Sequence, residues 1–361
     1  MITLQKEPFL QAIRAVKSSC GKANLQPILS TIHLKSENGG LTLTTTDLDN
    51  AAKSSIEANI TAPIDVCVNA DKLDSIVSRL DDTIILDIKD AFLIIISNNT
   101  KFEILWQSPE DFPEPNFELS DNKITLSSEI FISSINKTCL STQNDVGSVL
   151  NGICLVLDND AFEFASTDGN RLSQIFFKTP LQKKGQYIIP KKILLDVEKV
   201  AKQEVEMFFI QNGAHEKIIL KTNNCLYMGN LFSKAYPKYR QIIPQNQPKK
   251  VQINRSTLIN ALEKVAIMTN NTTFITEFVF SAKNSQLELF TKNDGGNAES
   301  KIDISLNFDE DFKIAFNYKF ILEGIKAMET ENIVLEMNDT LSCCLIKSNN
   351  FLYLVMPCQI K

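Results

Sequence analysis

The chain repeats one pattern three times along its length, and this repeat limits the folds that it can adopt. Three tripeptides mark it, SNN at 97–99, TNN at 222–224 and SNN at 348–350, at intervals of about 125 residues. Each tripeptide lies between two runs that are rich in apolar residues and have the length of β-strands. We therefore expect each to form the turn between the last two strands of a unit.

Helical patterns repeat at the same interval. Apolar residues spaced i, i+3, i+4 and i+7 predict two helices in each unit. Asn254 or Ser256 is suited to cap the fifth helix, and Pro190 is suited to the first turn of the fourth. Each unit then consists of a strand, a helix, several strands, a second helix and three strands, which is an α+β arrangement. The six segments are 6–20, 70–80, 128–139, 190–201, 254–266 and 317–328.

Two polar segments rich in proline, 108–123 and 242–250, separate the units. They divide the chain into three α+β domains with expected bounds of 1–120, 121–246 and 247–361. The other interpretation is that three unrelated domains of similar size follow one another, but this would not explain why turns, helices and linkers recur together.

Composition excludes several classes of protein. The eight cysteines are scattered without a Cys-x-x-Cys spacing, so we expect reduced, mostly buried thiols and neither a disulfide framework nor a zinc site. The longest apolar run, 91–96, is too short to span a bilayer. The N-terminal segment lacks the apolar core of a signal peptide. These features predict a cytoplasmic protein with no membrane partner.

The net charge is −6, but the charges are unevenly distributed along the chain. The six helical segments, with the residues directly after them, carry 14 Lys and Arg against eight Asp and Glu, so the remainder is strongly acidic. A basic surface made by helices suits a phosphate backbone that is contacted without sequence readout. The alternative is that lysine is a good helix former on solvated faces.

Motifs typical of enzymes are few. The chain has two histidines, His33 and His215, and we expect both to be structural or solvated. The sequence contains no G-x-S-x-G elbow, no P-loop and no G-x-G-x-x-G fingerprint.

Acidic residues offer one catalytic alternative. Asp47 and Asp49 could together hold a metal ion. However, TTTDLDN (44–50) occupies the place in the first unit that ASTDGNR (165–171) occupies in the second, and this shared place favours a turn of the repeat. A metal-dependent hydrolase that uses Asp168 or the Asp47–Asp49 pair stays an alternative function.

The segment TDGNRLS (167–173) resembles TDGHRLA, a signature of the bacterial β sliding clamp, the processivity subunit of DNA polymerase III. The resemblance extends in order from one end of the chain to the other. Its further segments are 25–49, 111–118, 149–155, 187–192, 236–244, 315–328 and 353–360.

The resemblance implies a protein that is not an enzyme and needs no cofactor or metal. Clamps of this family are head-to-tail homodimers in which helices line a central hole and sheets form the outside. The expected partners are double-stranded DNA, encircled without sequence preference, the replicative polymerase, the clamp loader, and repair and translesion polymerases. A monomeric scaffold that keeps the fold without the ring is the other alternative.

The family also has a peptide-binding cleft between its second and third domains. An apolar groove with a few polar groups is a suitable site for short linear peptides. The residues that the resemblance assigns to it are Leu150, Thr167, Gly169, Asn170, Arg171, Leu172, Pro237, Gln241, Ile242, Asn317, Phe320, Leu341, Cys343, Leu354, Met356, Pro357, Cys358 and Gln359.

Some of these positions depart from the family pattern. Asn170 stands where His is usual, Phe320 where Tyr is common, and Gln241 and Cys358-Gln359 where Arg and Met-Arg are more typical. Lys361 extends the tail by one residue. We therefore predict a weaker or shifted peptide preference. The residues that the resemblance places near DNA are Lys22, Asn144, Lys191 and Lys192, with Lys191 and Lys192 foremost.

Overall fold

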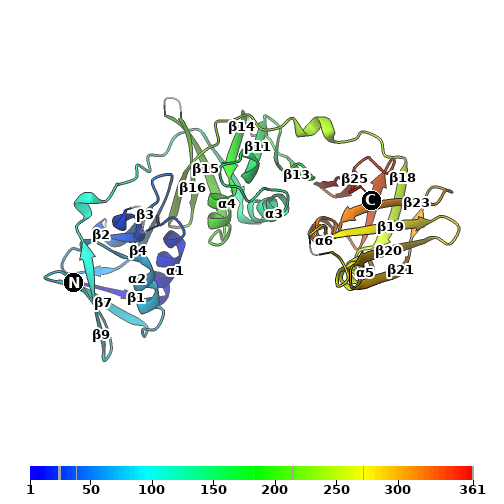
Figure 1. Cartoon of the computed structure of the whole chain (residues 1–361). Coiled ribbons are helices and arrows are strands. Elements are labelled where there is room, and N and C mark those ends of the chain that lie inside the picture. The colour runs from blue at the N-terminus through cyan, green and yellow to red at the C-terminus, as the bar shows by residue number, and fades with distance from the viewer. Residues whose placement is uncertain (23–25, 38, 182, 213–214, 271, 360–361) are drawn as a thin grey trace. The chain divides into compact units, whose positions relative to one another are not determined.

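The computed structural model describes residues 1–22, 26–37, 39–181, 183–212, 215–270 and 272–359 (Figure 1). Lys361, which we expected to extend the tail, lies outside these ranges. The chain forms two compact units. Unit 1 comprises Met1–Ile132 and Lys192–Ser233, and unit 2 comprises Ser133–Lys191 and Lys234–Lys361. The domain bounds expected from the repeat stay a prediction.

The same order of helices and longer strands occurs three times, as the repeat predicts, and the first and third repeats add a two-residue strand after their fourth strand. The first repeat contains β1 (Ile2–Gln5), α1 (Lys6–Lys17), β2 (Thr31–Glu37), β3 (Gly40–Thr46), β4 (Asn50–Glu57), β5 (Asn59–Ile60), β6 (Asp65–Asn69), α2 (Ala70–Val77), β7 (Thr83–Lys89), β8 (Phe92–Ser97) and β9 (Thr100–Gln107). The second contains β10 (Lys123–Ser127), α3 (Ser128–Cys139), β11 (Gly152–Asp158), β12 (Ala161–Thr167), β13 (Arg171–Lys178), β14 (Lys184–Pro190), α4 (Lys191–Glu198), β15 (Glu204–Asn212), β16 (His215–Thr222) and β17 (Cys225–Asn230). The third contains β18 (Lys249–Asn254), α5 (Arg255–Ala266), β19 (Ile275–Ser281), β20 (Gln286–Asn293), β21 (Gly296–Asp303), β22 (Ser305–Leu306), β23 (Phe312–Asn317), α6 (Tyr318–Ala327), β24 (Asn332–Met337), β25 (Cys344–Ser348) and β26 (Phe351–Val355).

The three marker tripeptides form the last hairpin turn of each repeat, as expected. Asn98, Asn223 and Asn349 adopt φ values of 47°, 49° and 50°. This left-handed region is disfavoured for most L-residues, and asparagine enters it more readily than other non-glycine residues. The asparagines of the repeat therefore mark a backbone requirement of the turn.

The six predicted helices are confirmed, and asparagine caps three of them. Asn254 accepts a hydrogen bond from the backbone N–H of Thr257, and Asn69 and Asn317 cap α2 and α6 in the same manner. The placement of Pro190 in the first turn of the fourth helix was wrong. Pro190 is the last residue of β14, opposite Gly152 of β11, so its extended backbone completes the strand and α4 begins one residue later.

The sheets extend from one repeat into the next. Unit 1 contains a 13-stranded sheet, in which β4 pairs with β17, and unit 2 contains a nine-stranded sheet, in which β13 pairs with β26. Each pairing is antiparallel and joins a strand of one repeat to the last strand of the following repeat. A four-stranded sheet, β21-β20-β19-β23, completes unit 2. Backbone hydrogen bonds therefore connect consecutive repeats at two equivalent junctions.

Helices pack on these sheets through apolar faces. In α1 the side chains of Phe9, Ile13 and Val16 are buried, and the hydroxyl of Tyr227 in β17 donates to Ala15 O at 3.0 Å. In unit 2, α6 lies so close to β26 that Gly324 faces the ring of Tyr353 directly. None of the helices in the described ranges is long and apolar enough to cross a membrane.

Several expected structural roles are confirmed. All eight cysteines are free thiols, and burial raises the pKa of Cys154 to about 11. His33 is buried in β2, where its ring nitrogens lie 2.7 Å from Asp65 Oδ1 and 3.2 Å from Glu114 Oε2. The side chain of His215 is outside the described part of the chain.

Candidate functional site

The turn between β12 and β13 is built by the side chains of Thr167 and Asp168. Thr167 Oγ1 donates to Arg171 O at 2.7 Å and accepts from the N–H of Gly169 at 3.1 Å. Asp168 Oδ1 accepts from the N–H groups of Asn170 and Arg171 at 2.9 and 3.1 Å. Gly169 has a φ of +93°, which suits a residue without a Cβ.

The equivalent turn of the first repeat, between β3 and β4, has the same bonds. Thr46 Oγ1 donates to Asn50 O at 2.9 Å and accepts from Leu48 N–H at 3.0 Å. Asp47 Oδ1 accepts from the N–H groups of Asp49 and Asn50 at 3.1 and 2.6 Å. The prediction that Thr-Asp belongs to a turn of the repeat is thus confirmed.

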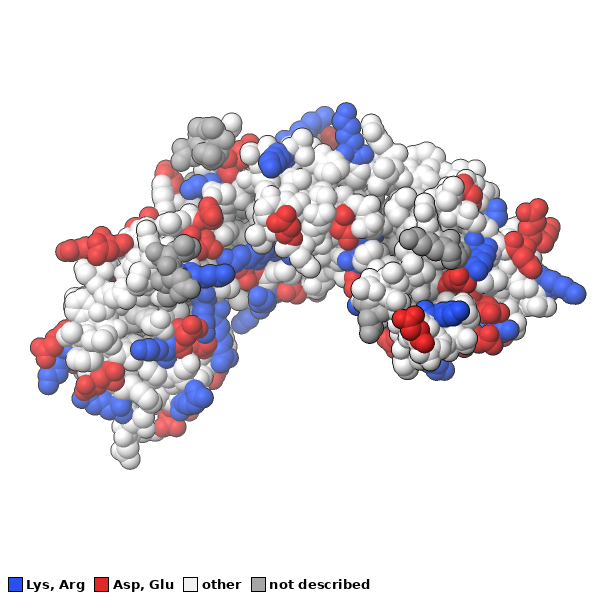
Figure 2. Space-filling view, in the orientation of Figure 1, with Lys and Arg blue, Asp and Glu red and all other residues white. Residues whose placement is uncertain are grey.

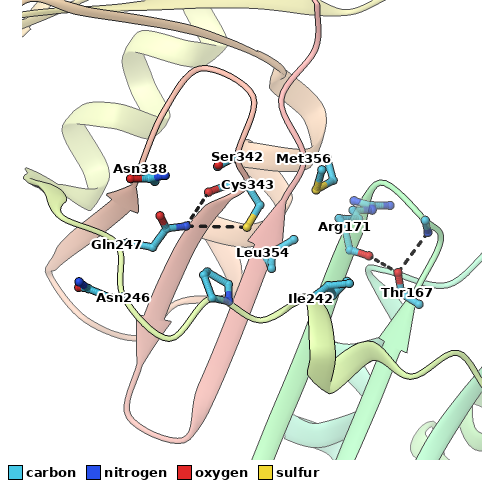
Figure 3. A pocket seen from close by; sticks show the side chains of 12 residues that line it. Thr167, Arg171, Ile242, Asn246, Gln247, Asn338, Ser342, Cys343, Leu354 and Met356 are labelled. Atoms are coloured by element: carbon cyan, nitrogen blue, oxygen red, sulfur yellow. Dashed lines mark hydrogen bonds between the residues drawn. The ribbon is translucent and has the colours of Figure 1, made fainter.

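A pocket of about 430 Å³ lies beside the second of these turns, within unit 2. Figure 3 shows Thr167, Arg171 and Ile242 at one end, amide side chains at the other, and Leu354 and Met356 between them. The middle is therefore apolar, one end combines Ile242 with the polar Thr167 and Arg171, and the far end is polar but uncharged. The residues that line it are Thr167, Gly169, Arg171, Ile242, Pro244, Asn246, Gln247, Asn338, Ser342, Cys343, Leu354 and Met356.

The guanidinium group of Arg171 is held by neighbouring side chains. Its Nε donates to Asp168 Oδ2 at 2.9 Å, its Nη1 donates to Glu323 of α6, and it stacks over the ring of Phe320 at 4.2 Å. Burial lowers the pKa of Arg171, but Tyr353 and the two carboxylates outweigh this effect and raise it above its ordinary value. Arg171 is thus a permanent cation whose charge is balanced inside the protein.

The polar end is formed by Gln247 and the loop that joins β24 to β25. Gln247 Nε2 donates to Cys343 O at 3.0 Å. The loop is organised by Asp339, whose Oδ1 accepts from the N–H groups of Leu341 and Ser342 at 2.9 and 2.7 Å. The Leu341 N–H, with the hydroxyl and the N–H of Ser342, holds the pKa of Asp339 below its usual range. The loop residues that line the pocket, Asn338, Ser342 and Cys343, are neutral.

Three models of one protein family match the chain in succession. The N-terminal domain of the DNA polymerase III beta subunit matches residues 1–117, the central domain matches 125–238, and the C-terminal domain matches 240–359. The chain belongs to the DNA polymerase III beta subunit family.

Known members of the family agree with this assignment over their full length. A beta sliding clamp from Synechococcus elongatus is 26% identical over 352 residues, which cover 93% of this chain and 92% of the relative. The beta subunit from Thermotoga maritima superimposes with a TM-score of 0.92 at 23% identity and covers 100% of this chain and 99% of its own. A sliding clamp from Pseudomonas aeruginosa bound to griselimycin gives 0.91 at 24% identity and 99% coverage of both chains. The chain thus has the three-domain clamp fold and is a sliding clamp of DNA polymerase III.

Part of the expected peptide-binding cleft of this clamp coincides with the pocket. The predicted residues that line it are Thr167, Gly169, Arg171, Ile242, Cys343, Leu354 and Met356. The resemblance did not indicate Pro244, Asn246, Gln247, Asn338 or Ser342, which also line it. Three of these five lie in the segment 242–250, whose polar and proline-rich composition favoured a linker.

The other predicted residues lie outside the pocket lining. Leu172 is fully buried opposite Leu354 in the β13·β26 ladder, so it lies beside a residue that lines the pocket. Asn170 is exposed, and its carbonyl accepts from Met356 N–H at 2.8 Å. Asn317 caps α6, and Phe320 supports the guanidinium of Arg171. The remaining residues, whose contact with a peptide stays a prediction, are Leu150, Pro237, Gln241, Leu341, Pro357, Cys358 and Gln359.

The four residues expected near DNA have different surroundings. Lys191 Nζ lies 3.0 Å from both Asn144 Oδ1 and Gln143 O in unit 2, so two of the predicted residues are in contact. In unit 1, Lys22 is exposed, and Lys192 Nζ donates to Asp47 Oδ2 at 2.8 Å. Their contact with DNA stays a prediction.

Unit 1 carries a basic surface that the individual motifs did not indicate. Figure 2 shows Lys and Arg side chains gathered over the region where α1 and α4 lie in Figure 1. A groove of about 550 Å³ runs beside α1 and is lined by Arg14, Lys199 and Lys202 among other residues. The signal for it in the sequence was the excess of basic residues in the helical segments.

The hydrolase alternative is not supported. Asp47 and Asp168 each stabilise a turn. Asp47 pairs with Lys192, and Asp168 pairs with Arg171. Asp49 Oδ1 accepts a hydrogen bond from Asn230 Nδ2 at 3.3 Å. Within the described ranges, no group of three or more His, Cys, Asp and Glu residues is arranged to hold a metal ion.

Proposed function

We propose that this clamp forms a ring with a second copy of itself, encircles duplex DNA without reading its sequence and tethers the replicative polymerase. The observation that carries the proposal is the repeated β-junction. β4 pairs with β17, and β13 pairs with β26. The corresponding strand of the third repeat, β21, is an edge strand of its sheet in the described structure. The last strand of the first repeat, β9, is its counterpart by position.

A second copy can supply the partner strand for β21, which is β9 of that copy. Pairing β21 of one copy with β9 of the other repeats the junction and produces a head-to-tail dimer. Beside β8, β9 pairs with β6 through Trp106 and Gln107, and within the described ranges no strand ladder covers that edge of β9 over Thr100–Leu105. A strand edge without a ladder readily accepts another chain. An exposed apolar pair on the β8–β9 hairpin supports this interface. Leu105 is 66% exposed and lies opposite Phe92, which is 37% exposed. Apolar groups placed in this way are typical of surfaces that become covered.

The basic surface over α1 and α4 suits duplex DNA. Lysine and arginine side chains attract phosphates in any sequence, and weak contacts of this kind allow a ring to slide. The acidic remainder of the chain disfavours other surfaces for DNA. In this proposal Lys192, Lys199 and Lys202 face the duplex, together with Lys22, Asn144 and Lys191.

The pocket of unit 2 is proposed to capture linear peptides from the polymerase catalytic subunit, the clamp loader, and repair and translesion polymerases. Its apolar middle and few polar groups suit such ligands, and the Pseudomonas aeruginosa clamp is bound to griselimycin. We place this activity in the cytoplasm and assign the clamp no catalytic reaction of its own.

Retention on circular DNA tests the ring. The clamp is loaded by its clamp loader and ATP onto a nicked plasmid, and the complex is isolated by gel filtration. We expect the clamp to stay bound until a restriction enzyme linearises the plasmid, after which it slides off. Equal retention on linear DNA would indicate that the clamp binds the surface of the duplex without encircling it, and would contradict the ring.

Light scattering tests the proposed dimer, and a peptide titration tests the proposed peptide site. The chain has a mass of 40.5 kDa, so a dimer should scatter as twice that mass. A 40.5-kDa species at micromolar concentration would support the monomeric scaffold instead.

A labelled consensus clamp-binding peptide should bind the wild-type clamp, but more weakly than it binds typical family members. An affinity equal to that of typical members would contradict the predicted shift in peptide preference.

A further inference from the structure

The groove beside α1 in unit 1 has an equivalent place in unit 2 that the protein fills with its own side chains. At each of the two β-junctions, the first helix of one repeat contacts the last strand of the next, α1 with β17 and α3 with β26. In unit 2, Lys137 Nζ lies 5.6 Å from the centroid of the Phe351 ring and donates to Glu329 Oε1 at 2.6 Å. Lys137 is 8% exposed, so these three side chains occupy the space between α3 and β26.

Smaller side chains stand at the same places in unit 1. The helices α1 and α3 both have 12 residues and both follow a strand directly, so Ala15 corresponds to Lys137. Cys225 begins β17 as Phe351 begins β26. Ala15 and Cys225 both line the groove of about 550 Å³, a volume within the range of about 300–1,000 Å³ that ligand sites occupy. The groove is therefore the space that the larger pair fills in unit 2.

The charge at this place also differs between the two units. After α6, unit 2 supplies the carboxylate of Glu329 to Lys137. After α4, unit 1 supplies Lys199 and Lys202, which line the groove. Unit 2 thus neutralises its own cation, whereas the groove has cations where unit 2 has the carboxylate. An anion from outside the protein would complete the arrangement in unit 1.

The basic edge of the groove is accessible to such an anion. Arg14 is the third cation that lines it, and Glu7 is the one carboxylate among the lining residues. Arg14 Nε lies 3.3 Å from Asp74 Oδ1, and the arginine side chain is 60% exposed. Lys199 Nζ lies 3.2 Å from Asp196 Oδ1, and the lysine side chain is 65% exposed. Exposed ion pairs contribute little free energy, so a phosphate can take the place of either carboxylate.

The floor of the groove is apolar, and its edge carries amide groups. Ala12 and Ile56 are buried and line the floor with Cys225. Burial raises the pKa of the Cys225 thiol, which therefore stays neutral. The Nδ2 groups of Asn223 and Asn224 at the edge each donate to a backbone carbonyl, which holds both amides in place. A ligand on this floor thus meets apolar groups below it and uncharged polar groups beside it.

We propose that the groove beside α1 binds an unpaired nucleotide, with its base on the apolar floor and its phosphate between Arg14, Lys199 and Lys202. A base has apolar faces and an edge of donors and acceptors, which suit the floor and the amides, and basic grooves attract the phosphate. A fatty acyl chain would leave the amides without a partner, and a paired base is stacked inside its duplex and cannot reach the floor. The groove shares no lining residue with the pocket of unit 2.

Two sources can supply this ligand. One is a free nucleotide, and the other is an unpaired nucleotide in a DNA strand that the clamp contacts. The second source rests on the proposed DNA-binding function, and the first does not.

Methyl NMR on the full-length clamp tests the groove with a free nucleotide. The probes are deoxyadenosine monophosphate, deoxyadenosine and inorganic phosphate. Ile56 reports from the floor, and Ile267, which is 81% exposed and does not line the groove, is the control. We expect the nucleotide to shift the methyl resonance of Ile56 and not that of Ile267. It should bind at least about tenfold more tightly than deoxyadenosine or phosphate alone, because base and phosphate bind together.

Two kinds of variant separate the floor from the edge. Cys225→Phe places on the floor the ring that unit 2 has there, and it should weaken nucleotide binding by at least about tenfold. Lys199→Gln or Lys202→Gln should weaken it by about threefold, the size typical of an exposed ion pair. Lys72→Gln, in α2, is the charge-matched control, because Lys72 is exposed and does not line the groove. The wild-type shift of Ile56 stays decisive if a variant folds poorly.

Two DNA hairpins of equal length test the second source, one fully paired and one with a single unpaired nucleotide. In fluorescence anisotropy, wild type should prefer the hairpin with the unpaired nucleotide by about threefold or more, and Cys225→Phe should bind both equally. Binding of the free nucleotide without this preference would identify the free nucleotide as the ligand. The preference without binding of the free nucleotide would identify the DNA strand. Each of these results supports the site.

The nucleotide site is refuted if neither ligand shifts Ile56, or if Cys225→Phe binds both ligands as wild type does. It is also refuted if the nucleotide binds no better than inorganic phosphate while the two hairpins bind equally, since that result describes a surface that attracts any phosphate. The titrations with the free nucleotide need no ring. A clamp that binds the nucleotide but is not retained on circular DNA would contradict encirclement and leave the nucleotide site intact.

Discussion

Lys192 at the start of α4 forms an ion pair with Asp47 in the β3–β4 turn, with Nζ 2.8 Å from Oδ2. The lysine side chain is 45% exposed and the aspartate 21%. The pair connects a helix of the second repeat to a turn of the first within unit 1. A DNA phosphate that approaches Lys192 has to compete with this carboxylate, so Asp47 should moderate the contribution of Lys192 to DNA binding.

Replacing each partner should change DNA binding in opposite directions. Lys192→Glu should weaken binding of a short duplex at low salt by about threefold or more, because it exchanges attraction to phosphate for repulsion. Asp47→Asn should strengthen binding and steepen the slope of log affinity against log salt by about 0.9, the value for one further phosphate contact. Asn keeps an oxygen that can accept from Asn50 N–H, so the turn is preserved.

Fluorescence anisotropy over a series of salt concentrations measures both effects. Lys283→Glu, in an exposed turn between β19 and β20, is the charge-matched control and should behave as wild type. An unchanged salt slope in Asp47→Asn would mean that Lys192 does not contact DNA.

Ile242→Asp should abolish most peptide binding without unfolding the clamp. Ile242 is 53% exposed and lines the pocket, so a carboxylate there removes apolar contact and introduces a charge that a bound peptide would bury. We expect affinity for the consensus peptide to fall by at least about tenfold. Ile267→Asp is the control, because Ile267 is 81% exposed and does not line the pocket. Equal losses in both variants would contradict the assignment of the pocket.

Leu105→Lys should shift the proposed dimer towards monomer. The substitution places a charge on β9, in the apolar pair with Phe92 that we propose the second copy covers. Light scattering across a dilution series should show dissociation at higher concentration than in wild type. Leu119→Lys, at a leucine between β9 and β10 that is 42% exposed, should leave the mass unchanged. A wild-type profile for Leu105→Lys would place the interface elsewhere.

Gly324→Ala should destabilise unit 2. A Cβ on Gly324 would overlap the ring of Tyr353, whose hydroxyl donates to Phe320 O at 2.9 Å and keeps the ring in place. We expect a loss of about 1–3 kcal/mol in the free energy of unfolding, measured by urea denaturation. Gly147→Ala is the matched control, since the nearest atom to its Cβ would be Asp145 Oδ1 at 3.6 Å. If both variants were as stable as wild type, α6 would have to be able to move away from β26.

Glu206 should make part of the stability of unit 1 depend on pH. Lys123 and Lys221 hold the pKa of Glu206 below its ordinary value. Because the folded pKa is the lower one, this stabilisation is present above the unfolded pKa of about 4.3 and is lost as pH falls through the folded pKa. Wild type should therefore lose more stability than Glu206→Gln on acidification below about pH 4.3. Glu310→Gln, in an exposed loop, is the control and should lose stability with pH as wild type does. Parallel acid curves for wild type and Glu206→Gln would show that protonation of Glu206 does not affect the stability of unit 1.

The elements of the fold could be predicted from the sequence because each depends on local patterns. The turns at Asn98, Asn223 and Asn349 and the helix capped by Asn254 are encoded within a few residues, and the repeat supplied three copies of each pattern. Pro190 shows the limit of this reasoning. Its fixed φ suits the first turn of a helix and also the end of a strand, and pairing with Gly152 decided between them.

The details of the pocket could not be predicted in this way, because they depend on contacts between distant segments. Gln247 lies in a polar stretch typical of a linker, and it is buried because the loop before β25 covers it 96 residues later in the chain. Arg171 was assigned to the peptide-binding cleft by the resemblance. Its guanidinium is instead occupied by Glu323, 152 residues away, and no local pattern indicates that pairing.

The β4·β17 and β13·β26 ladders hold consecutive repeats together through backbone hydrogen bonds, in addition to the covalent linkers. A protease that cut the segment between Pro113 and Pro115 would sever the backbone and leave every hydrogen bond of the β4·β17 ladder intact. The linkers then act as tethers while the protein folds, by keeping the partner strands at high effective concentration. Once the ladders have formed, two separate fragments should stay together through them, at concentrations high enough to replace the effective concentration that the linker supplied.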